Sequence, residues 1–442
     1  MTSTFTYAKA KGALPFLGHA ISLVSNPRDF LRSLPAQGDL VKIGIGPSKA
    51  FVICDPDLTH QVLVNDRIFD KGGPFVDRLR EFIGDSVSTC PRSEHRRQRR
   101  LMQPAFHHSR FPAYAAMMVE ETTTVIDQWR DGEVIDVYAM MQAITTKITA
   151  RTMFASSASA ALIADAYDAL NDIIMGAGRR MLTPPPLDRV PTPGKRRYDR
   201  ARVRIREITD QLVAEYRAAG VDHQDLMSML LAARDENGDV LSDQEISDQV
   251  VTLFLGGVET VASTLGWALC LLAQHPDVEQ RLDEEVDAVV GEGQPGWEHL
   301  SELSFTTGII NESLRMYPPG WLLTRIATAD TELGGHTIPR GATVIYSPYL
   351  LHYRKDLFPE PERFAPDRWT GSTKPPRFAF VPFADGPRRC IGDTFTMIEA
   401  PLVLATIARR WRMHPVGATM RPTRHMSLLL TPRKMKIRLA VR

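Results

Sequence analysis

The 442-residue chain has few cysteines, no excess of charge of either sign and no long stretch of biased composition. Four widely spaced cysteines are too few for a disulfide scaffold or for a zinc site built from paired CxxC motifs. The chain has 53 lysines and arginines and 52 aspartates and glutamates, so its formal charge is +1. This excludes the strongly basic composition of a dedicated nucleic-acid-binding protein. The remaining composition is ordinary for a globular protein, and the length suits one large domain or two to three smaller ones. The cysteines are Cys54, Cys90, Cys270 and Cys390.

A targeting or anchoring segment is also lacking. The apolar run near the start is broken by Pro15 and His19 without a small-residue cleavage site, so we expect no signal peptide, no membrane anchor and a cytoplasmic location. One stretch, Val250 to Ala273, is apolar enough to span a membrane. A capping box from Ser242 to Glu245 precedes it and Pro276 follows it, which predicts one long helix inside a large soluble domain.

Hydrophobic periodicity predicts a mainly α fold with minor β structure. Helical patterns dominate the first half of the chain, and strand signals become more frequent after Pro318. A proline-rich stretch from Thr183 to Gly194 is typical of an exposed connection. The expected helices include Ala160–Arg180 and Lys195–Ala219, and the expected strands are Leu40–Ile45, Ala50–Cys54, Thr343–Tyr346 and Met426–Leu430.

The strongest chemical signal is a cysteine in a glycine-containing loop, Phe383-Ala-Asp-Gly386-Pro-Arg388-Arg-Cys390-Ile-Gly392. A helical pattern from Asp393 to about Arg410 follows, so a thiolate at Cys390 would face the positive end of a helix, which predicts a lowered pKa and suits metal binding. Gly386 permits a tight turn, and Gly392 leaves room for a flat cofactor. A lone cysteine is more often a small buried apolar residue. The five spaced identities, FxxGxRxCxG, nevertheless resemble the haem-binding loop of the cytochrome P450 family.

Two further motifs stand in the order found in that family. Glu312 and Arg315 fit its ExxR helix motif, which alone is weak because such pairs are usually salt bridges on a helix surface. The segments Pro361–Phe364 and Ala365–Trp369 then precede the cysteine loop. The resemblance implies that Glu312, Arg315 and Arg363 form a buried ion network, whose disruption would strand a charge and prevent haem incorporation.

The long helix contains Gly256-Gly257-Val258-Glu259-Thr260-Val261, which resembles the oxygen-activation segment of the family, with Val261 in place of a second hydroxyl. Thr252 and Ser263 share a helical face with this segment. The alternative is a glycine-weakened core helix in which Thr260 bonds back to its own backbone. Each glycine costs about 1 kcal/mol relative to alanine, which favours close approach of a ligand. The resemblance assigns catalytic roles to Thr260, nearest the oxygen, and to Glu259, which supplies protons.

A third motif lies in the basic run from Glu94 to Arg100. His95 and Arg99 are four residues apart and therefore share one helical face. They match family positions that bind the haem propionates, as do Arg325 and Arg388. A nucleic-acid or membrane-surface patch is the alternative, but this run stands alone in a neutral chain. We expect three further arginines to face an acidic electron donor, namely Arg96, Arg100 and Arg389.

The resemblance extends from Pro15 to Leu430 and implies a single-domain cytochrome P450 fold over residues 1–442, a triangular helical domain with a small β region. It implies one haem b, with the iron bound by Cys390, and a monooxygenase that uses dioxygen and electrons from a ferredoxin and its reductase. The cofactor-binding residues implied are His95, Arg99, Arg325, Arg388, Phe383, Gly386, Gly392, Gly256 and Gly257.

The substrate is expected to be a hydrophobic small molecule, because the family pocket positions are mainly apolar here. The stretch Phe69–Pro74 resembles actinobacterial enzymes that oxidise sesquiterpene hydrocarbons, whereas fatty acids, steroids and macrolides remain alternatives. Peroxygenation, isomerisation and a haem-thiolate sensor without turnover also remain open, although the Glu259 and Thr260 pair favours use of dioxygen. The pocket positions are Phe75, Phe82, Phe254, Val258, Val261, Leu322, Leu323 and Met426.

Overall fold

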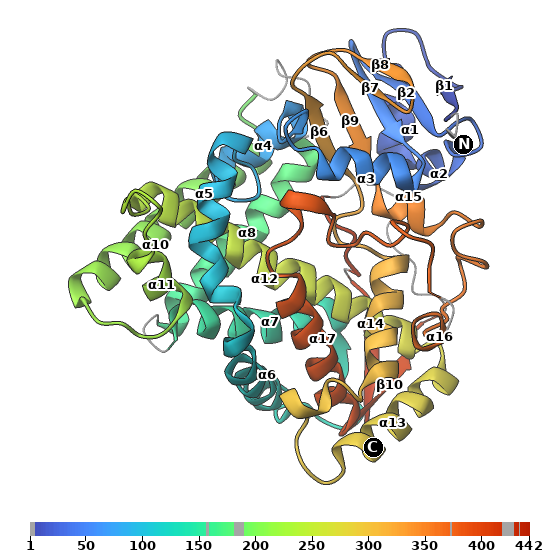
Figure 1. Cartoon of the computed structure of the whole chain (residues 1–442). Coiled ribbons are helices and arrows are strands. Elements are labelled where there is room, and N and C mark those ends of the chain that lie inside the picture. Colours follow the sequence, from blue (N-terminus) through green and yellow to red (C-terminus); the bar gives the residue numbers. More distant parts are fainter. Residues whose placement is uncertain (1–4, 156–158, 181–189, 372–373, 418–427, 433) are drawn as a thin grey trace.

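Helices form most of the molecule, and most of the strands gather around the N-terminal end of the chain (Figure 1). The computed structural model describes residues 5–155, 159–180, 190–371, 374–417, 428–432 and 434–442. The helices are α1 (Ala20–Ser25), α2 (Pro27–Ser33), α3 (Pro56–Val64), α4 (Gly73–Ile83), α5 (Arg92–Met102), α6 (Phe111–Ile126), α7 (Val137–Phe154), α8 (Ala160–Arg180), α10 (Pro193–Ala219), α11 (Leu226–Ala232), α12 (Asp243–Leu272), α13 (Pro276–Val290), α14 (Ser304–Met316), α15 (Pro348–His352), α16 (Asp367–Thr370) and α17 (Asp393–Ala408). The strands are β1 (Tyr7–Lys9), β2 (Leu40–Ile45), β3 (Ser48–Ile53), β4 (Phe69–Asp70), β5 (Val134–Asp136), β6 (Leu323–Ala327), β7 (Thr331–Leu333), β8 (His336–Ile338), β9 (Thr343–Tyr346), β10 (Trp411–Pro415) and β11 (Lys436–Val441).

The largest sheet has the strand order β1-β2-β3-β9-β6-β4. β2 and β3 form an antiparallel hairpin that pairs Leu40 with Ile53, and β9 joins β3 in parallel. β6 is antiparallel to β9 on one side and to β4 on the other. The short β4 therefore places the residues that follow it beside β6, although about 250 residues separate the two in the sequence. Smaller sheets have the orders β10-β11-β5 and β7-β8.

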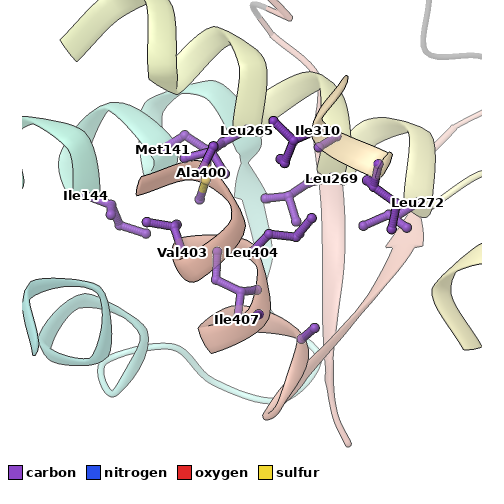
Figure 2. Packing of buried hydrophobic residues seen from close by; sticks show 14 of the residues in the cluster. Met141, Ile144, Leu265, Leu269, Leu272, Ile310, Ala400, Val403, Leu404 and Ile407 are labelled. Atoms are coloured by element: carbon purple, nitrogen blue, oxygen red, sulfur yellow. The ribbon is translucent and has the colours of Figure 1, made fainter. Parts of the chain in front are cut away.

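The long helix α12 organises the core. Ser242 accepts a hydrogen bond from the N–H of Glu245, and the Glu245 carboxylate accepts one from the N–H of Ser242, so the expected capping box is present. α12 packs against α7, α10, α14 and α17. Figure 2 shows Leu265, Leu269 and Leu272 of α12 among apolar side chains of α7, α14 and α17. Within the described residues α12 alone is long and apolar enough to cross a membrane, and its apolar stretch is mostly buried.

Several predicted elements are confirmed, including β2, β9 and α8 with their expected bounds. The strand expected at Met426–Leu430 is not formed in its described part, residues 428–430. The carbonyl of Leu430 instead accepts hydrogen bonds from the Ser263 hydroxyl (2.5 Å) and the Trp267 indole N–H (3.0 Å) of α12. Residues 418–427, and most of the proline-rich connection at 181–189, lie outside the described residues.

Glu312 and Arg315 of α14 form the expected buried pair, with neither side chain exposed. Arg315 donates from Nε and Nη2 to the two oxygens of Glu312, both at 2.8 Å. The prediction that Arg363 completes this network is wrong: its side chain is 68% exposed and bonds to Glu360, and only its carbonyl contacts Arg315.

The third member of the network is Arg368, on α16. Its Nε lies 3.3 Å from Oε1 of Glu312, and the indole N–H of Trp369 donates to Oε2 at 3.0 Å. α16 packs directly against α14, which brings both side chains to the buried carboxylate. Spacing in the sequence did not distinguish the two arginines, because each follows a proline and an acidic residue.

The two arginines give a matched pair of variants. We expect Arg368→Ala to lower the free energy of unfolding by about 3 kcal/mol, because it leaves the buried Glu312 with one cation fewer. Arg363→Ala removes only an exposed ion pair and should change the free energy of unfolding by less than about 0.5 kcal/mol. Urea unfolding of both proteins measures the difference, and equal losses would contradict the placement of Arg368.

Candidate active site

The loop before α17 holds Cys390 by backbone constraints. Cys390 N–H donates to the carbonyl of Phe383 at 2.9 Å, and Asp385 accepts from Gly386 N–H at 2.7 Å. Gly386 has a φ of +67°, and a Cβ there would lie 2.5 Å from the carbonyl oxygen of Leu63 in α3. Glycine is thus required both by the turn and by the close approach of α3, as the sequence predicted for the turn.

Cys390 keeps an exposed surface although protein atoms lie closely around its thiol. Burial raises the pKa of the thiol, whereas the Gly392 N–H and the charges of Arg99 and Arg389 act to lower it. The expected lowering of the pKa is therefore wrong for the thiol by itself, because desolvation outweighs the start of α17. A metal ion bound to the sulfur would favour the thiolate.

One face of α12 is open in the same part of the molecule. Gly256 is exposed although Phe254, Val258 and Glu259 around it are buried, and a Cβ on Gly256 would meet no atom within 4 Å. Thr260 lies one turn further on, and its hydroxyl donates to the Gly256 carbonyl at 2.5 Å. α12 packs against α17, the helix that begins directly after the cysteine loop (Figure 1).

Gly257 and Glu259 face α7, on another side of α12. A Cβ on Gly257 would lie 2.8 Å from the Thr149 hydroxyl, so its missing side chain lets α7 approach, and contact of Gly257 with the cofactor stays a prediction. Glu259 is 2% exposed and accepts a hydrogen bond from Gln142 at 2.8 Å and another from the Tyr138 hydroxyl. These two buried hydrogen bonds fix the position of the Glu259 carboxylate.

Positive charge converges beside this space. His95 and Arg99 come from α5, Arg325 from β6, and Arg388 from the turn before Cys390. Arg325 is 1% exposed, and its Nη2 is one of the buried polar atoms without a hydrogen-bond partner. Arg388 donates to the carbonyl of Cys90 (3.0 Å) and to Asp70 (2.7 Å). Arg99 donates to the carbonyl of Arg389 at 2.6 Å, which ties α5 to the cysteine loop.

A fifth member of this cluster, Lys71, was not predicted. Burial and the charges of Arg325 and Arg388 hold its pKa well below its usual range. Burial, followed by the charges of Arg388, Arg99, Lys71 and Arg325, lowers the pKa of His95 to about 3. Burial and the charge of Arg325 lower the pKa of Arg388. Lys71 lies in the stretch Phe69–Pro74 that the sequence singles out for another reason. Its position beside Arg325 depends on the pairing of β4 with β6, which the sequence does not show.

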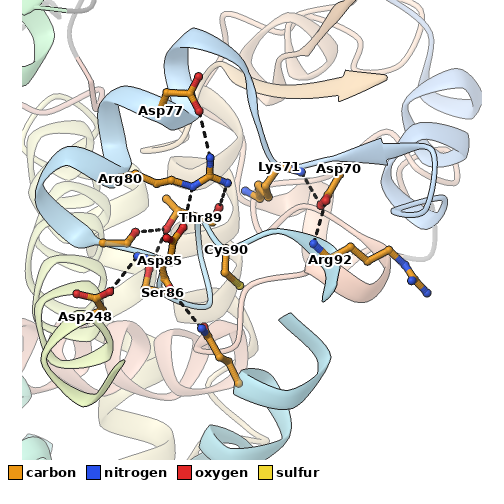
Figure 3. A network of polar contacts seen from close by, with 12 residues as sticks. Asp70, Lys71, Asp77, Arg80, Asp85, Ser86, Thr89, Cys90, Arg92 and Asp248 are labelled. Carbon is orange, nitrogen blue, oxygen red and sulfur yellow. Dashed lines mark hydrogen bonds and ion pairs between the residues drawn. The ribbon is translucent and has the colours of Figure 1, made fainter. Parts of the chain in front are cut away.

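The segment between α4 and α5 positions part of this cluster (Figure 3). Asp70 accepts hydrogen bonds from the backbone N–H groups of Lys71 (2.7 Å) and Arg92 (2.9 Å). Arg80 donates to the carbonyl of Thr89 at 2.6 Å, and Asp248 of α12 accepts from Asp85 N–H at 2.9 Å. This network links β4, α4 and α12 at the point where α5, with His95, begins.

A dianion fits this arrangement. Lys71, Arg99, Arg325 and Arg388 bring four cations together, and a donor of Arg325 still lacks an acceptor. Two carboxylates would supply that acceptor and offset the repulsion among buried like charges. The residues present therefore fit a haem: the cluster would hold its propionates and Cys390 would hold its iron. Phe383 is half-buried against the main core, and Gly392 would have only Phe106 near a Cβ.

The predicted substrate-pocket residues divide into two groups. Phe82, Phe254, Val258 and Val261 are only 1–3% exposed and fill apolar clusters, so they belong to the core and do not line an open space. Phe75, Leu322 and Leu323 keep some accessible surface, and Leu253, which was not predicted, lies one turn before Gly256 on the open face of α12. Met426 lies outside the described residues.

The three arginines expected to face an electron donor are exposed. Arg100 pairs with Glu236 and Arg389 with Asp393. Arg96 has no acidic partner within the part of the chain that the structure describes.

Residues 9–439 match the family described as Cytochrome P450, and the chain belongs to that family. It is thus a cytochrome P450 monooxygenase, and the family implies a haem whose iron is held by a cysteine thiolate. The chain is 44% identical to cyclooctat-9-en-7-ol 5-monooxygenase of Streptomyces melanosporofaciens, over 94% of this chain and 91% of that protein. It is 41% identical to pentalenene oxygenase of Streptomyces avermitilis, over 99% and 98%, and 42% identical to cyclooctatin synthase of Streptomyces melanosporofaciens, over 98% and 96%.

The lowered pKa of His95 predicts a pH-dependent stability of the haem-free protein. Because the unfolded chain protonates near pH 6.5 and the folded chain near pH 3, stability falls as the pH drops through this window. Between pH 7 and pH 5 the loss attributable to His95 is about 2 kcal/mol.

Urea unfolding of the wild type and of His95→Gln at both pH values measures this loss. The variant should lose less stability than the wild type, and identical losses would show that His95 is not held neutral by its surroundings.

Proposed function

We propose that residues 1–442 form one haem-thiolate monooxygenase domain that oxidises an uncharged terpenoid of secondary metabolism. The observations that carry this proposal are the exposed Cys390 at the start of α17, the exposed Gly256 of α12, on which a Cβ would meet no atom within 4 Å, and the basic groups whose charges act on His95. Three relatives that cover nearly the whole chain are named for terpenoid oxidation, which supports the substrate class.

Cys390 is the proposed iron ligand, and the cation cluster of His95, Arg99, Arg325, Arg388 and Lys71 is the proposed propionate site. The bound haem supplies dioxygen activation, so that one oxygen atom enters a C–H bond and the other leaves as water. The backbone hydrogen bonds of the cysteine loop hold the Cys390 sulfur in place. The hydrogen bond from Arg99 to the Arg389 carbonyl fixes the position of α5, and so of part of the propionate site, relative to this loop.

Thr260 and Glu259 have separate proposed roles in proton delivery. Thr260 lies one turn after the exposed Gly256, and its O–H would donate a proton for the dioxygen chemistry that the haem supplies once it turns away from the Gly256 carbonyl. Glu259 faces α7 and is held by Tyr138 and Gln142. It would have to swing from these partners toward Thr260 to pass a proton inward, so the α7 side is the proposed source of protons.

The substrate site is proposed to be apolar and without an ionic anchor. The accessible side chains near the open face include Leu253, Leu323 and Phe75, and the nearby cations are engaged by the proposed propionate site. The electron donor is proposed to be a ferredoxin that docks against Arg96, Arg100 and Arg389, and the protein is proposed to work in the cytoplasm.

A ligand panel tests the substrate class. We expect sesquiterpene and diterpene hydrocarbons or alcohols to displace water from the iron and shift the haem toward high spin at micromolar concentrations. Fatty acids, steroids and macrolides should give weaker shifts, and tighter binding of any of these classes would refute the terpenoid assignment. Formation of an oxygenated product that depends on reduced ferredoxin and dioxygen then separates an enzyme from a haem-thiolate sensor.

The role of Thr260 is tested by coupling efficiency. Thr260→Ala should keep the consumption of reducing equivalents within a few-fold of wild type while product falls at least tenfold and hydrogen peroxide rises, because proton delivery loses its hydroxyl. Thr260→Ser retains the hydroxyl and should stay largely coupled. Tight coupling in the alanine variant would remove Thr260 from the proton path.

A further inference from the structure

An exposed apolar patch lies far from the proposed active site, on the segment before and within α1. We call it the entry patch; it consists of Leu14, Phe16, Leu17, Ile21, Val24 and Ile45. Phe16 is 96% exposed and Ile21 50% exposed, and Leu14 and Leu17 are each 47% exposed. Ile21 and Val24 lie three residues apart on α1 and therefore share its outward face. Leu17 belongs to the turn before α1, and its carbonyl accepts a hydrogen bond from Gly46, next to Ile45. Scattered exposed apolar residues are ordinary, but a contiguous group of this kind indicates an interaction surface.

The backbone beneath the entry patch is tightly held. Leu14 and Gly18 exchange two hydrogen bonds of 2.9 Å, which close a turn with Phe16 at its tip. The N–H of His19 donates to the Gly44 carbonyl (2.7 Å) and that of Gly46 to the Leu17 carbonyl (3.1 Å), so the turn is fixed to the β2–β3 hairpin. A Cβ on Gly18 would lie 2.5 Å from the Gly44 carbonyl oxygen, which shows how closely the two backbones approach.

The exposure of Phe16 is therefore a property of an ordered turn. Its φ of +59° lies in the left-handed region, which costs a non-glycine residue free energy that the surrounding bonds must offset. A rigid turn with an apolar tip loses little conformational entropy when it binds.

Exposed lysines lie next to the entry patch, which also has one carboxylate at its edge, that of Asp29, which accepts a hydrogen bond from Asn26 at the end of α1. Lys9 and Lys11 precede Leu14 in the chain, and Lys49 pairs with Gly44 next to Ile45. Among the described residues none of these three ammonium groups has a carboxylate partner. An apolar tip with a lysine rim matches a surface that offers negative charge above an apolar layer.

We propose that the entry patch binds the surface of an anionic lipid bilayer, with Phe16 and Leu17 inserted among the headgroups and Lys9, Lys11 and Lys49 against lipid phosphates. A second copy of the chain is a poorer match, because a symmetric contact would bring the lysine rims of both copies together. The proposal does not depend on the substrate class, although a hydrophobic substrate dissolved in lipid would then lie close to the protein.

Vesicle flotation of the haem-loaded protein tests this proposal. Wild type should float with phosphatidylcholine vesicles that contain phosphatidylglycerol, bind much less to phosphatidylcholine alone, and dissociate as salt is raised. Phe16→Ser should weaken the partitioning about tenfold, the order expected for one buried aromatic side chain. The triple change of Lys9, Lys11 and Lys49 to Gln should remove the preference for anionic vesicles.

Val203→Ser is the matched control, because Val203 is 59% exposed on α10, outside the entry patch. It should float like wild type. Unchanged flotation of Phe16→Ser, or no binding of wild type to anionic vesicles, would overturn the proposal. The proposal would also be overturned if the protein did not bind vesicles but formed a dimer by light scattering and Phe16→Ser dissociated that dimer. The entry patch would then bind a second copy of the chain.

Discussion

Repulsion among buried cations is the constraint on which the site depends. Lys71, Arg99, Arg325 and Arg388 come from four segments of the chain, and burial together with their charges lowers the pKa of His95 to about 3. Burying several cations next to one another lowers the stability of the folded chain unless bound anions neutralise them. The six-stranded sheet and the network of Figure 3 bring these residues together, so much of the β region and of α5 can be understood as the support of one anion site.

Two faces of the helix α12 have different surroundings. On one face Gly256 and Thr260 border the open space, and on another Gly257 and Glu259 contact α7. The two adjacent glycines thus serve different purposes, one leaving room for a ligand and the other for a helix. This division also directs the hydroxyl and the carboxylate to different partners, so the proposed proton path would include a movement of the Glu259 side chain.

Local signals in the sequence predicted local features well. The capping box at Ser242 set the start of α12, and periodicity gave α8 and β9 with the bounds that the structure shows. The pairing of Glu312 with Arg315 was also predictable, since both lie on one helix. Arg368, Lys71 and the contact of Gly257 with Thr149 were missed because each depends on packing between distant segments. The pKa of Cys390 was misjudged because the sequence shows a helix terminus but not the depth of burial.

We propose that Cys390 ligates the haem iron. The absorption spectrum of the reduced protein under carbon monoxide tests it most directly. The account predicts the red-shifted Soret band characteristic of thiolate ligation in the wild type, and its loss in Cys390→His with the shift to the band characteristic of imidazole ligation. A wild-type band at the imidazole position, or a thiolate band that survives replacement of Cys390, would contradict it.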